Sequence, residues 1–257
     1  MKKFINILIL CLPFQLYAQD SIVSNFENIS FDTKLITTAN DIDQQGPVLT
    51  RNLGQSALIT DIQFSPDNKF IVTTDVERNV KFWDAYSGRF LRSQKAPYDI
   101  ISLAISPDSK TYATSGTTTS GVHLISLWDI YSAEKIRDFN GHSEKINDLE
   151  FPKGGDYLAS VSTDKTLRIW DLISGKELEN YPLGMEGLSV GIHPLGLQLV
   201  VSGNSSGIEV WNRNSKSKIA TLETPGKSYV NSVSTLDVDF HLYLVAGVGN
   251  YLAKWQH

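Results

Sequence analysis

A single cysteine, Cys11, occurs in the 257 residues, and it lies in an apolar segment near the start of the chain. The rest of the chain therefore has no thiol for a disulfide, a metal site or covalent catalysis. Basic residues are also in the minority, because 23 lysines and arginines face 28 aspartates and glutamates and the net charge is −5. A chain without a basic excess is a poor candidate for binding nucleic acid or an anionic membrane surface.

Long apolar runs are missing as well. The longest one, Phe4 to Leu12, is interrupted by Asn6 and is too short to span a bilayer. It follows a basic start and precedes a more polar exit that ends at Ala18. This order predicts a bacterial-type signal peptide over residues 1–18 and export to the periplasm or the cell exterior.

Two alternatives to a cleaved signal peptide stay open at the start of the chain. A lipid anchor at Cys11 would require a small residue before it, and Leu10 is bulky. The segment could also form a buried N-terminal strand. Residues 19–46 are expected to form an extension that is partly disordered or an incomplete structural repeat, followed by one domain over residues 47–257.

The five tryptophans of the chain are evenly spaced. They occupy positions 83, 128, 170, 211 and 255, so the gaps are 45, 42, 41 and 44 residues. Turn markers recur at fixed offsets from them, for example Ser65-Pro66-Asp67 and Ser106-Pro107-Asp108 upstream, and Ser87-Gly88 and Ser174-Gly175 downstream. A fixed period of this length indicates a repeat architecture.

Each repeat unit contains short apolar or alternating runs between its turns. In the unit around Trp170, these runs are 146–151, 157–161, 167–170 and 177–181, and they are rich in β-branched and aromatic residues. No window shows a helical period over 12 residues. Runs of this length and composition predict strands. Four strands in about 43 residues predict one propeller blade per unit.

The unit around Trp170 carries a known signature, namely Gly141-His142, Asp164 and Trp170-Asp171. It resembles the WD-repeat family, and the resemblance extends over residues 48–257. It implies an all-β propeller with about five four-stranded blades. It also implies a hydrogen-bond chain within a blade, here His142, Ser162, Asp164 and Trp170. Further repeat markers are Trp83, Asp84, Trp128, Asp129, Asp171, Trp211 and Trp255.

The other units depart from this signature. The first has Gln55 in the histidine place and Glu77 in the aspartate place, and the fourth has Ser205 in the aspartate place. The last unit lacks a fourth strand, whereas residues 47–52 offer a spare one, so the N-terminal strand is expected to complete the C-terminal blade. A closed five-blade ring is favoured over an open arc, or an arc completed by a second copy. An open ring would expose two apolar sheet faces and promote homo-oligomerisation.

Reactive side chains do not form a site that the sequence reveals. The five histidines have no metal-ligand spacing among them, and no Gly-x-Ser-x-Gly nucleophile motif occurs. The aspartates after three of the tryptophans are interpreted as turn residues. We therefore expect no catalysis, no metal and no cofactor.

The expected function is that of an exported, non-catalytic scaffold that binds a protein or peptide through its loops. The alternative is a propeller-type hydrolase, or a protein that binds a glycan or small ligand in the central funnel. Aromatic and arginine side chains are favoured at interface centres. On that basis the predicted partner-binding residues are Arg78, Tyr98, Lys145 and Tyr229.

Overall fold

The computed structural model describes residues 57–205, 207–224, 229–238, 241–248 and 251–256, all of which belong to the unit Arg51–His257. Within these ranges every regular element is a strand, and no helix occurs. That part of the chain accordingly offers no helix with the length and hydropathy needed to span a membrane. The spare strand expected at 47–52 lies outside the described residues, so closure of the ring remains a prediction.

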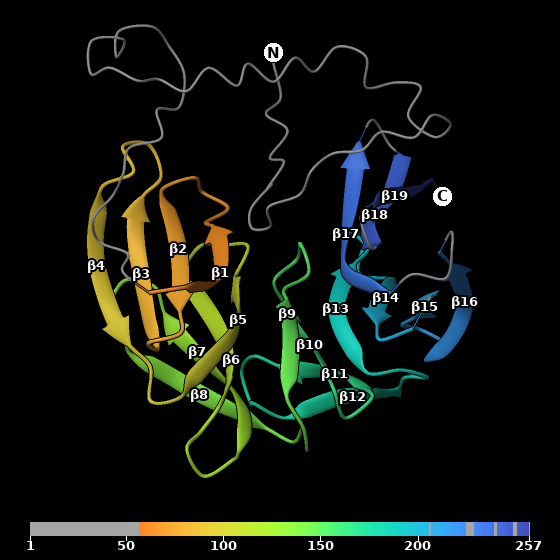
Figure 1. Ribbon diagram of the computed structural model, residues 1–257, viewed down its shortest axis with the longest axis horizontal. Coiled ribbons are helices and arrows are strands. Elements are labelled where there is room, and N and C mark those ends of the chain that lie inside the picture. Colours follow the sequence, from red (N-terminus) through yellow and green to blue (C-terminus); the bar gives the residue numbers. More distant parts are fainter. Residues whose placement is uncertain (1–56, 206, 225–228, 239–240, 249–250, 257) are drawn as a thin grey trace, which may run out of the picture. The chain divides into compact units, whose positions relative to one another are not determined.

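The strands form five antiparallel sheets that follow one another along the chain (Figure 1). The first contains β1 (Ile59–Phe64), β2 (Phe70–Asp75), β3 (Asn79–Asp84) and β4 (Phe90–Lys95). The second contains β5 (Asp99–Ile105), β6 (Thr111–Thr117), β7 (His123–Asp129) and β8 (Lys135–Asn140). The third contains β9 (Ile146–Glu150), β10 (Tyr157–Ser162), β11 (Thr166–Asp171) and β12 (Glu177–Pro182).

The fourth sheet contains β13 (Gly187–Ile192), β14 (Gln198–Gly203), β15 (Gly207–Asn212) and β16 (Ser217–Glu223). The fifth has three strands, β17 (Val230–Val238), β18 (His241–Val248) and β19 (Tyr251–Gln256). Every tryptophan lies on the third strand of its sheet. The repeated four-stranded sheets confirm the predicted all-β repeat fold.

Successive sheets pack face to face, with β1 against β5, β5 against β9, β9 against β13, and β13 against β17. The alternation of side chains along each strand supplies both faces. On β10, Leu158 packs toward the second sheet with Phe139 and Trp170, whereas Tyr157 and Val161 pack toward the fourth. Because it packs on both sides, β10 is buried along its whole length.

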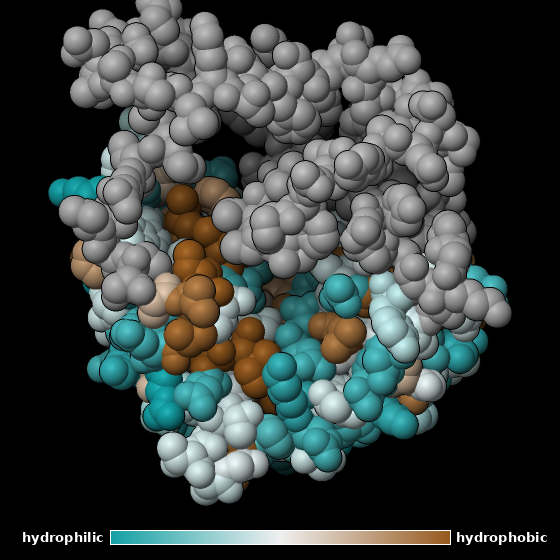
Figure 2. All heavy atoms as spheres, viewed as in Figure 1, coloured by the Kyte–Doolittle hydropathy of each residue, from teal (hydrophilic) through white to brown (hydrophobic). Residues whose placement is uncertain are grey.

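Each sheet has two ends. The loops before the first strands and the turns after the second strands lie at one end, which we call the loop face. The turns after the first and third strands lie at the other end, which we call the turn face. In the view of Figure 2, hydrophobic side chains gather over the first two sheets, and mostly hydrophilic ones lie over the third and fourth.

Candidate interaction surface

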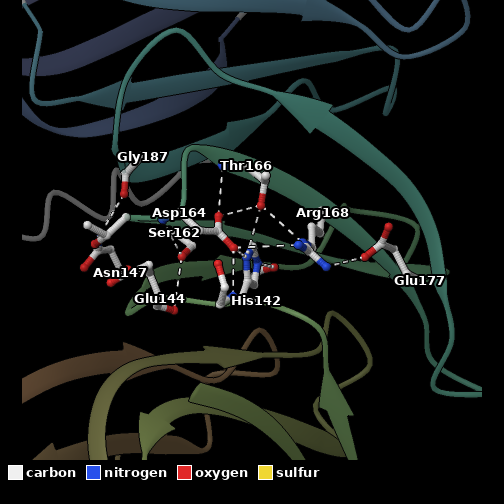
Figure 3. Close-up of polar contacts among 12 residues, drawn as sticks. His142, Glu144, Asn147, Ser162, Asp164, Thr166, Arg168, Glu177 and Gly187 are labelled. Atoms are coloured by element: carbon white, nitrogen blue, oxygen red, sulfur yellow. Dashed lines mark hydrogen bonds and ion pairs between the residues drawn. The ribbon is translucent and has the colours of Figure 1, made fainter. Parts of the chain in front are cut away.

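The third sheet contains a hydrogen-bond chain that connects its core to the loop face, and Figure 3 shows the part of it around His142, Asp164 and Thr166. The Trp170 indole Nε1 donates to Ser160 Oγ at 2.8 Å, and Ser160 Oγ lies 2.7 Å from His142 Nε2. On the other side of the ring, His142 Nδ1 lies 2.8 Å from Asp164 Oδ2. The structure thus brings together three of the four residues expected in this chain.

The fourth expected residue, Ser162, does not take part, because Ser160 is the serine that joins the indole to the imidazole. Both serines point to the same side of β10. Trp170 lies opposite Leu158, so its ring reaches Ser160 two residues along, and Ser162 lies about 6.6 Å further on. Ser162 Oγ instead bonds the Glu144 carbonyl at 3.2 Å and accepts from Asp164 N at 3.0 Å.

The protonation states of His142 and Asp164 determine which atoms donate and which accept in this hydrogen-bond chain. Burial lowers the pKa of His142, although Asp164 opposes the shift, so the imidazole is neutral at pH 7. A neutral ring has one donor and one acceptor. Ser160 Oγ–H then donates to Nε2, and Nδ1–H donates to Asp164. Burial raises the pKa of Asp164, but hydrogen bonds from His142 and Thr166 outweigh it and hold the pKa well below its ordinary value.

Arg168 and Gly141 complete the arrangement at the loop face. Arg168 Nη1 pairs with Glu177 Oε2 at 2.6 Å, and its Nε donates to Thr166 Oγ1 at 3.1 Å. A Cβ at Gly141 would lie 2.7 Å from Arg168 Nη1 and 3.0 Å from the Trp170 ring. A side chain at this position would therefore displace the Arg168 guanidinium and crowd the indole next to His142.

The second sheet achieves the same connection with a different residue, Tyr98. Its hydroxyl lies 2.6 Å from Thr114 Oγ1, which also accepts from Trp128 Nε1 at 3.0 Å. Tyr98 thus occupies the place of His142 and is only 1% exposed. The prediction that Tyr98 binds a partner is wrong, because its ring belongs to the core. Gly116 makes room for that ring, since a Cβ there would lie 2.2 Å from Tyr98 Cδ2.

The first and fourth sheets keep the tryptophan but change its acceptor. Trp83 Nε1 donates to Thr73 Oγ1 at 3.0 Å, in register with the pair on the third sheet. In the fourth sheet Val201 stands where a hydroxyl is needed, and Trp211 Nε1 donates to Glu209 Oε2 at 3.1 Å instead. The indole N–H therefore finds an acceptor in each of the four sheets, as burial requires.

The aspartates that follow three of the tryptophans hold turns at the turn face. Asp84 Oδ1 accepts from Ser87 N at 2.7 Å, and Asp129 Oδ1 accepts from Ser132 N at 2.7 Å. Asp171 makes the corresponding bonds to the turn that contains Ser174. Hydrogen bonds from these turn serines lower the pKa of all three carboxyls, so they are ionised acceptors and not proton donors at neutral pH.

The other three predicted partner-binding residues lie at the loop face, and they differ in their exposure and in whether they are paired. Arg78 Nε is paired with Asp99 Oδ1 at 2.7 Å. Lys145 is exposed, and Tyr229 is 63% exposed. Leu58, at 77% exposure, lies beside Val76, whose amide bonds the Leu58 carbonyl at 3.0 Å. The loop face thus presents an exposed aromatic, an exposed cation and a small apolar patch.

A belt of polar side chains on the innermost strands escaped the sequence analysis. Asp61 Oδ2 accepts from Leu103 N at 2.8 Å and from Ser102 Oγ at 3.3 Å, which links the first and second sheets. Asp148 accepts from Ser102 Oγ at 3.3 Å and from Ser189 Oγ at 2.7 Å, which links the second, third and fourth. The partners lie 41 to 46 residues apart, so no local pattern reveals them.

Burial raises the pKa of Asp61 to about 6, with a smaller contribution from the charge of Asp148. Burial raises the pKa of Asp148 as well. The described residues contain no group of three or more histidines, cysteines, aspartates or glutamates that could hold a metal ion. The hydrogen bonds of the belt connect neighbouring sheets, and its carboxyls accept them from serine hydroxyls and backbone amides.

Comparison with known proteins agrees with this geometry. The family described as "WD domain, G-beta repeat" matches residues 47–84 and 133–171. The pre-mRNA-splicing factor cwf17 of Schizosaccharomyces pombe is 29% identical over 193 residues, which cover 70% of this chain and 54% of that protein. WD repeat-containing protein 36 of Homo sapiens is 31% identical over 175 residues, covering 66% of this chain and 18% of that protein.

A third relative is the target of rapamycin complex subunit wat1 of Schizosaccharomyces pombe, which is 27% identical over 155 residues. That match covers 59% of this chain and 48% of wat1. The chain thus spans about half or less of the length of these curated relatives. The repeat matches, the WD-repeat relatives and the four-stranded sheets together support a WD-repeat family for this chain.

Proposed function

We propose that this chain is an exported, non-catalytic scaffold that binds a protein or peptide through its loop face. The observation that carries the proposal is that the histidine and aspartate side chains with catalytic potential make structural hydrogen bonds. His142 and Asp164 are bonded to each other and to neighbours in the third sheet. Asp84 and Asp171 hold turns. What the loop face leaves free are the contact residues Lys145 and Tyr229, together with the patch at Leu58 and Val76.

The relatives support a role in assembly. One is named as a pre-mRNA-splicing factor and another as a subunit of a complex. Export rests on the segment 1–18, which has the charge and apolar pattern of a signal peptide. A partner in the periplasm or at the cell exterior follows from that pattern.

Affinity capture with the full-length chain tests both parts of the proposal. Baits would be the wild-type chain and a Tyr229→Ala plus Lys145→Ala variant, each incubated with envelope and cytosolic fractions of the source cell. Because both residues are exposed, the double variant should fold normally and recover several-fold less partner from the envelope fraction. The matched control is Tyr86→Ala, which removes a fully exposed aromatic from the turn face.

Equal recovery by the double variant and the wild-type chain would remove the loop face as the binding surface. A partner recovered from the cytosolic fraction alone would contradict export. Loss of recovery with Tyr86→Ala, while the double variant binds normally, would move the surface to the opposite end of the sheets.

A further inference from the structure

One position of the repeat changes its chemistry between the sheets. The second residue after the tryptophan is Ala85, Ile130, Leu172 and Arg213 in the first four units. Ile130 is buried in the core between the first and second sheets, and Leu172 packs on the core between the second and third. Between the third and fourth sheets, an arginine takes the place of this apolar wedge. A local departure from a repeated packing rule often marks a functional site.

Arg213 builds a polar cluster in the space that the wedge would fill. Its Nε and Nη2 each lie 3.2 Å from Glu179 Oε1, on the outer strand of the third sheet. Its guanidinium carbon lies 3.9 Å from the centre of the Tyr157 ring. Glu179 also accepts from the Tyr181 hydroxyl. One cation therefore holds two neighbouring sheets together through a carboxylate and an aromatic ring.

A cavity of about 500 Å³ opens beside this cluster at the turn face. Residues of both sheets line it, including Asp156, Tyr157 and Glu179 from the third, and Leu195, Arg213 and Lys216 from the fourth. Pockets of roughly 300–1,000 Å³ accept small ligands. The cavity is thus large enough for a molecule of the size of a mono- or disaccharide.

The Tyr157 hydroxyl lacks an acceptor for its proton at this site. Tyr157 is 1% exposed, and its only polar neighbour is the donor Arg213, so within the described part of the chain no group accepts from its Oη. Burial raises the pKa of Tyr157 to about 12, so at neutral pH the hydroxyl keeps its proton and can donate it. Buried polar groups are nearly always hydrogen-bonded, and an exception needs an explanation. The cavity lies beside this buried residue, and an oxygen atom of a ligand that reached the hydroxyl from there would supply the acceptor.

The charges of the lining select against an ion. Arg213 is neutralised by Glu179, and at the rim Asp156 and Lys216 have opposite signs. A charged ligand would gain little net attraction, whereas a neutral molecule with many hydroxyls can use donors and acceptors of both kinds. Leu195, at 74% exposure, offers an apolar contact at the edge. We propose that the cavity between the third and fourth sheets binds a neutral, hydroxyl-rich ligand, a mono- or disaccharide.

Ligand titrations followed by NMR on the full-length chain test this proposal. The probes are glucose, galactose, mannose, N-acetylglucosamine, maltose and cellobiose, with inorganic phosphate and acetate as charged comparators. We expect saturable binding of at least one sugar in the millimolar range and none of the anions. Tyr157→Phe removes only the hydroxyl whose proton has no acceptor, so folding stability should change little while the sugar binds roughly three- to tenfold more weakly.

Two further variants separate binding from folding. Arg213→Leu restores the apolar wedge found at Leu172 and should abolish binding. Tyr112→Phe is the matched control, because that hydroxyl bonds Gln94 at 2.7 Å between other sheets, so it should lower stability and leave sugar binding unchanged. Failure of the folded wild-type chain to bind any sugar, preferential binding of phosphate, or equal sugar affinity of Tyr157→Phe would each overturn the proposal.

Discussion

Individual hydrogen-bonding groups decide which residues of this repeat stabilise its fold. Ser160 is fully buried and serves both Trp170 and His142, so its removal leaves an indole N–H and an imidazole nitrogen without a partner. Ser162, two residues away, serves the Glu144 carbonyl and the Asp164 amide near the exposed loop. Two serines on one face of one strand thus differ in what they support.

We therefore expect Ser160→Ala to lower the free energy of unfolding by about 2 kcal/mol or more, because each orphaned buried group costs roughly 1–3 kcal/mol. Ser162→Ala should cost about 1 kcal/mol, because the groups it releases can turn to water. Urea denaturation of both variants gives the comparison. A larger loss for Ser162→Ala would show that the serine expected from the sequence is the important one.

The sequence pattern predicted one of these residues and missed the other for a geometric reason. Both serines lie within the spacing that the WD signature allows, and only the pairing of Leu158 with Trp170 selects Ser160. Tyr98 was misjudged for a similar reason. An aromatic before a first strand is consistent with an exposed interface residue. That it takes the place of His142 becomes visible only when Thr114 and Trp128 are seen beside it.

At the level of strands and turns, local chemistry carried nearly all of the prediction. Predicted runs such as 157–161 and 177–181 coincide with β10 and β12 to within one residue, because proline, glycine and serine mark the turns on either side. The bulges near the starts of β1 and β5 were not predicted, because they arise from pairing with β2 and β6. Element boundaries are thus local, whereas register is not.

The side chain in the loop before a first strand and the residue that faces it at the end of the second strand have to match in size. In the second sheet, the large ring of Tyr98 lies against Gly116, while the third sheet combines the smaller His142 with Ser162 at the corresponding register. Gly116→Ala would place a Cβ 2.2 Å from Tyr98 Cδ2 and 2.3 Å from the Asp99 carbonyl. The overlap cannot be relieved without moving β5 or the ring.

We expect Gly116→Ala to cost about 3 kcal/mol of stability through overpacking, measured by thermal and urea denaturation. Gly121→Ala is the control. Gly121 has a φ of 82° and open space around its Cβ position, so only backbone strain of about 1–2 kcal/mol applies. Equal losses for the two variants would show that the Tyr98 ring yields easily and that its contact with Gly116 is loose.

At the scale of the whole group of sheets, the belt of Asp61, Ser102, Asp148 and Ser189 connects the first strands of four successive repeats through hydrogen bonds. Its residues occupy the same place on successive first strands, yet they alternate between carboxylate and hydroxyl, so the repeat signature does not reveal them. Two carboxyls that share one serine hydroxyl are stabilised when one of them holds a proton. The connection between sheets should therefore depend on pH.

The sign of this dependence follows from Asp61. In the unfolded chain its carboxyl titrates near 3.8, whereas in the folded chain burial raises the pKa to about 6. The folded state binds the proton more tightly, so the free energy of unfolding should fall as the pH rises from about 4 to about 6 and stay lower above that.

Asp61→Asn keeps an oxygen that can accept from Leu103 N but cannot ionise. The stability of this variant relative to the wild-type chain should therefore increase over this window, as followed by urea denaturation. Asp84→Asn is the control: hydrogen bonds from Ser87 lower the pKa of Asp84 below 3.8, so the difference from the wild-type chain should change in the opposite direction and mainly below about pH 4. A pH-independent difference for Asp61→Asn would show that water reaches this carboxyl, and that the belt holds the sheets together as an ordinary ionised acceptor.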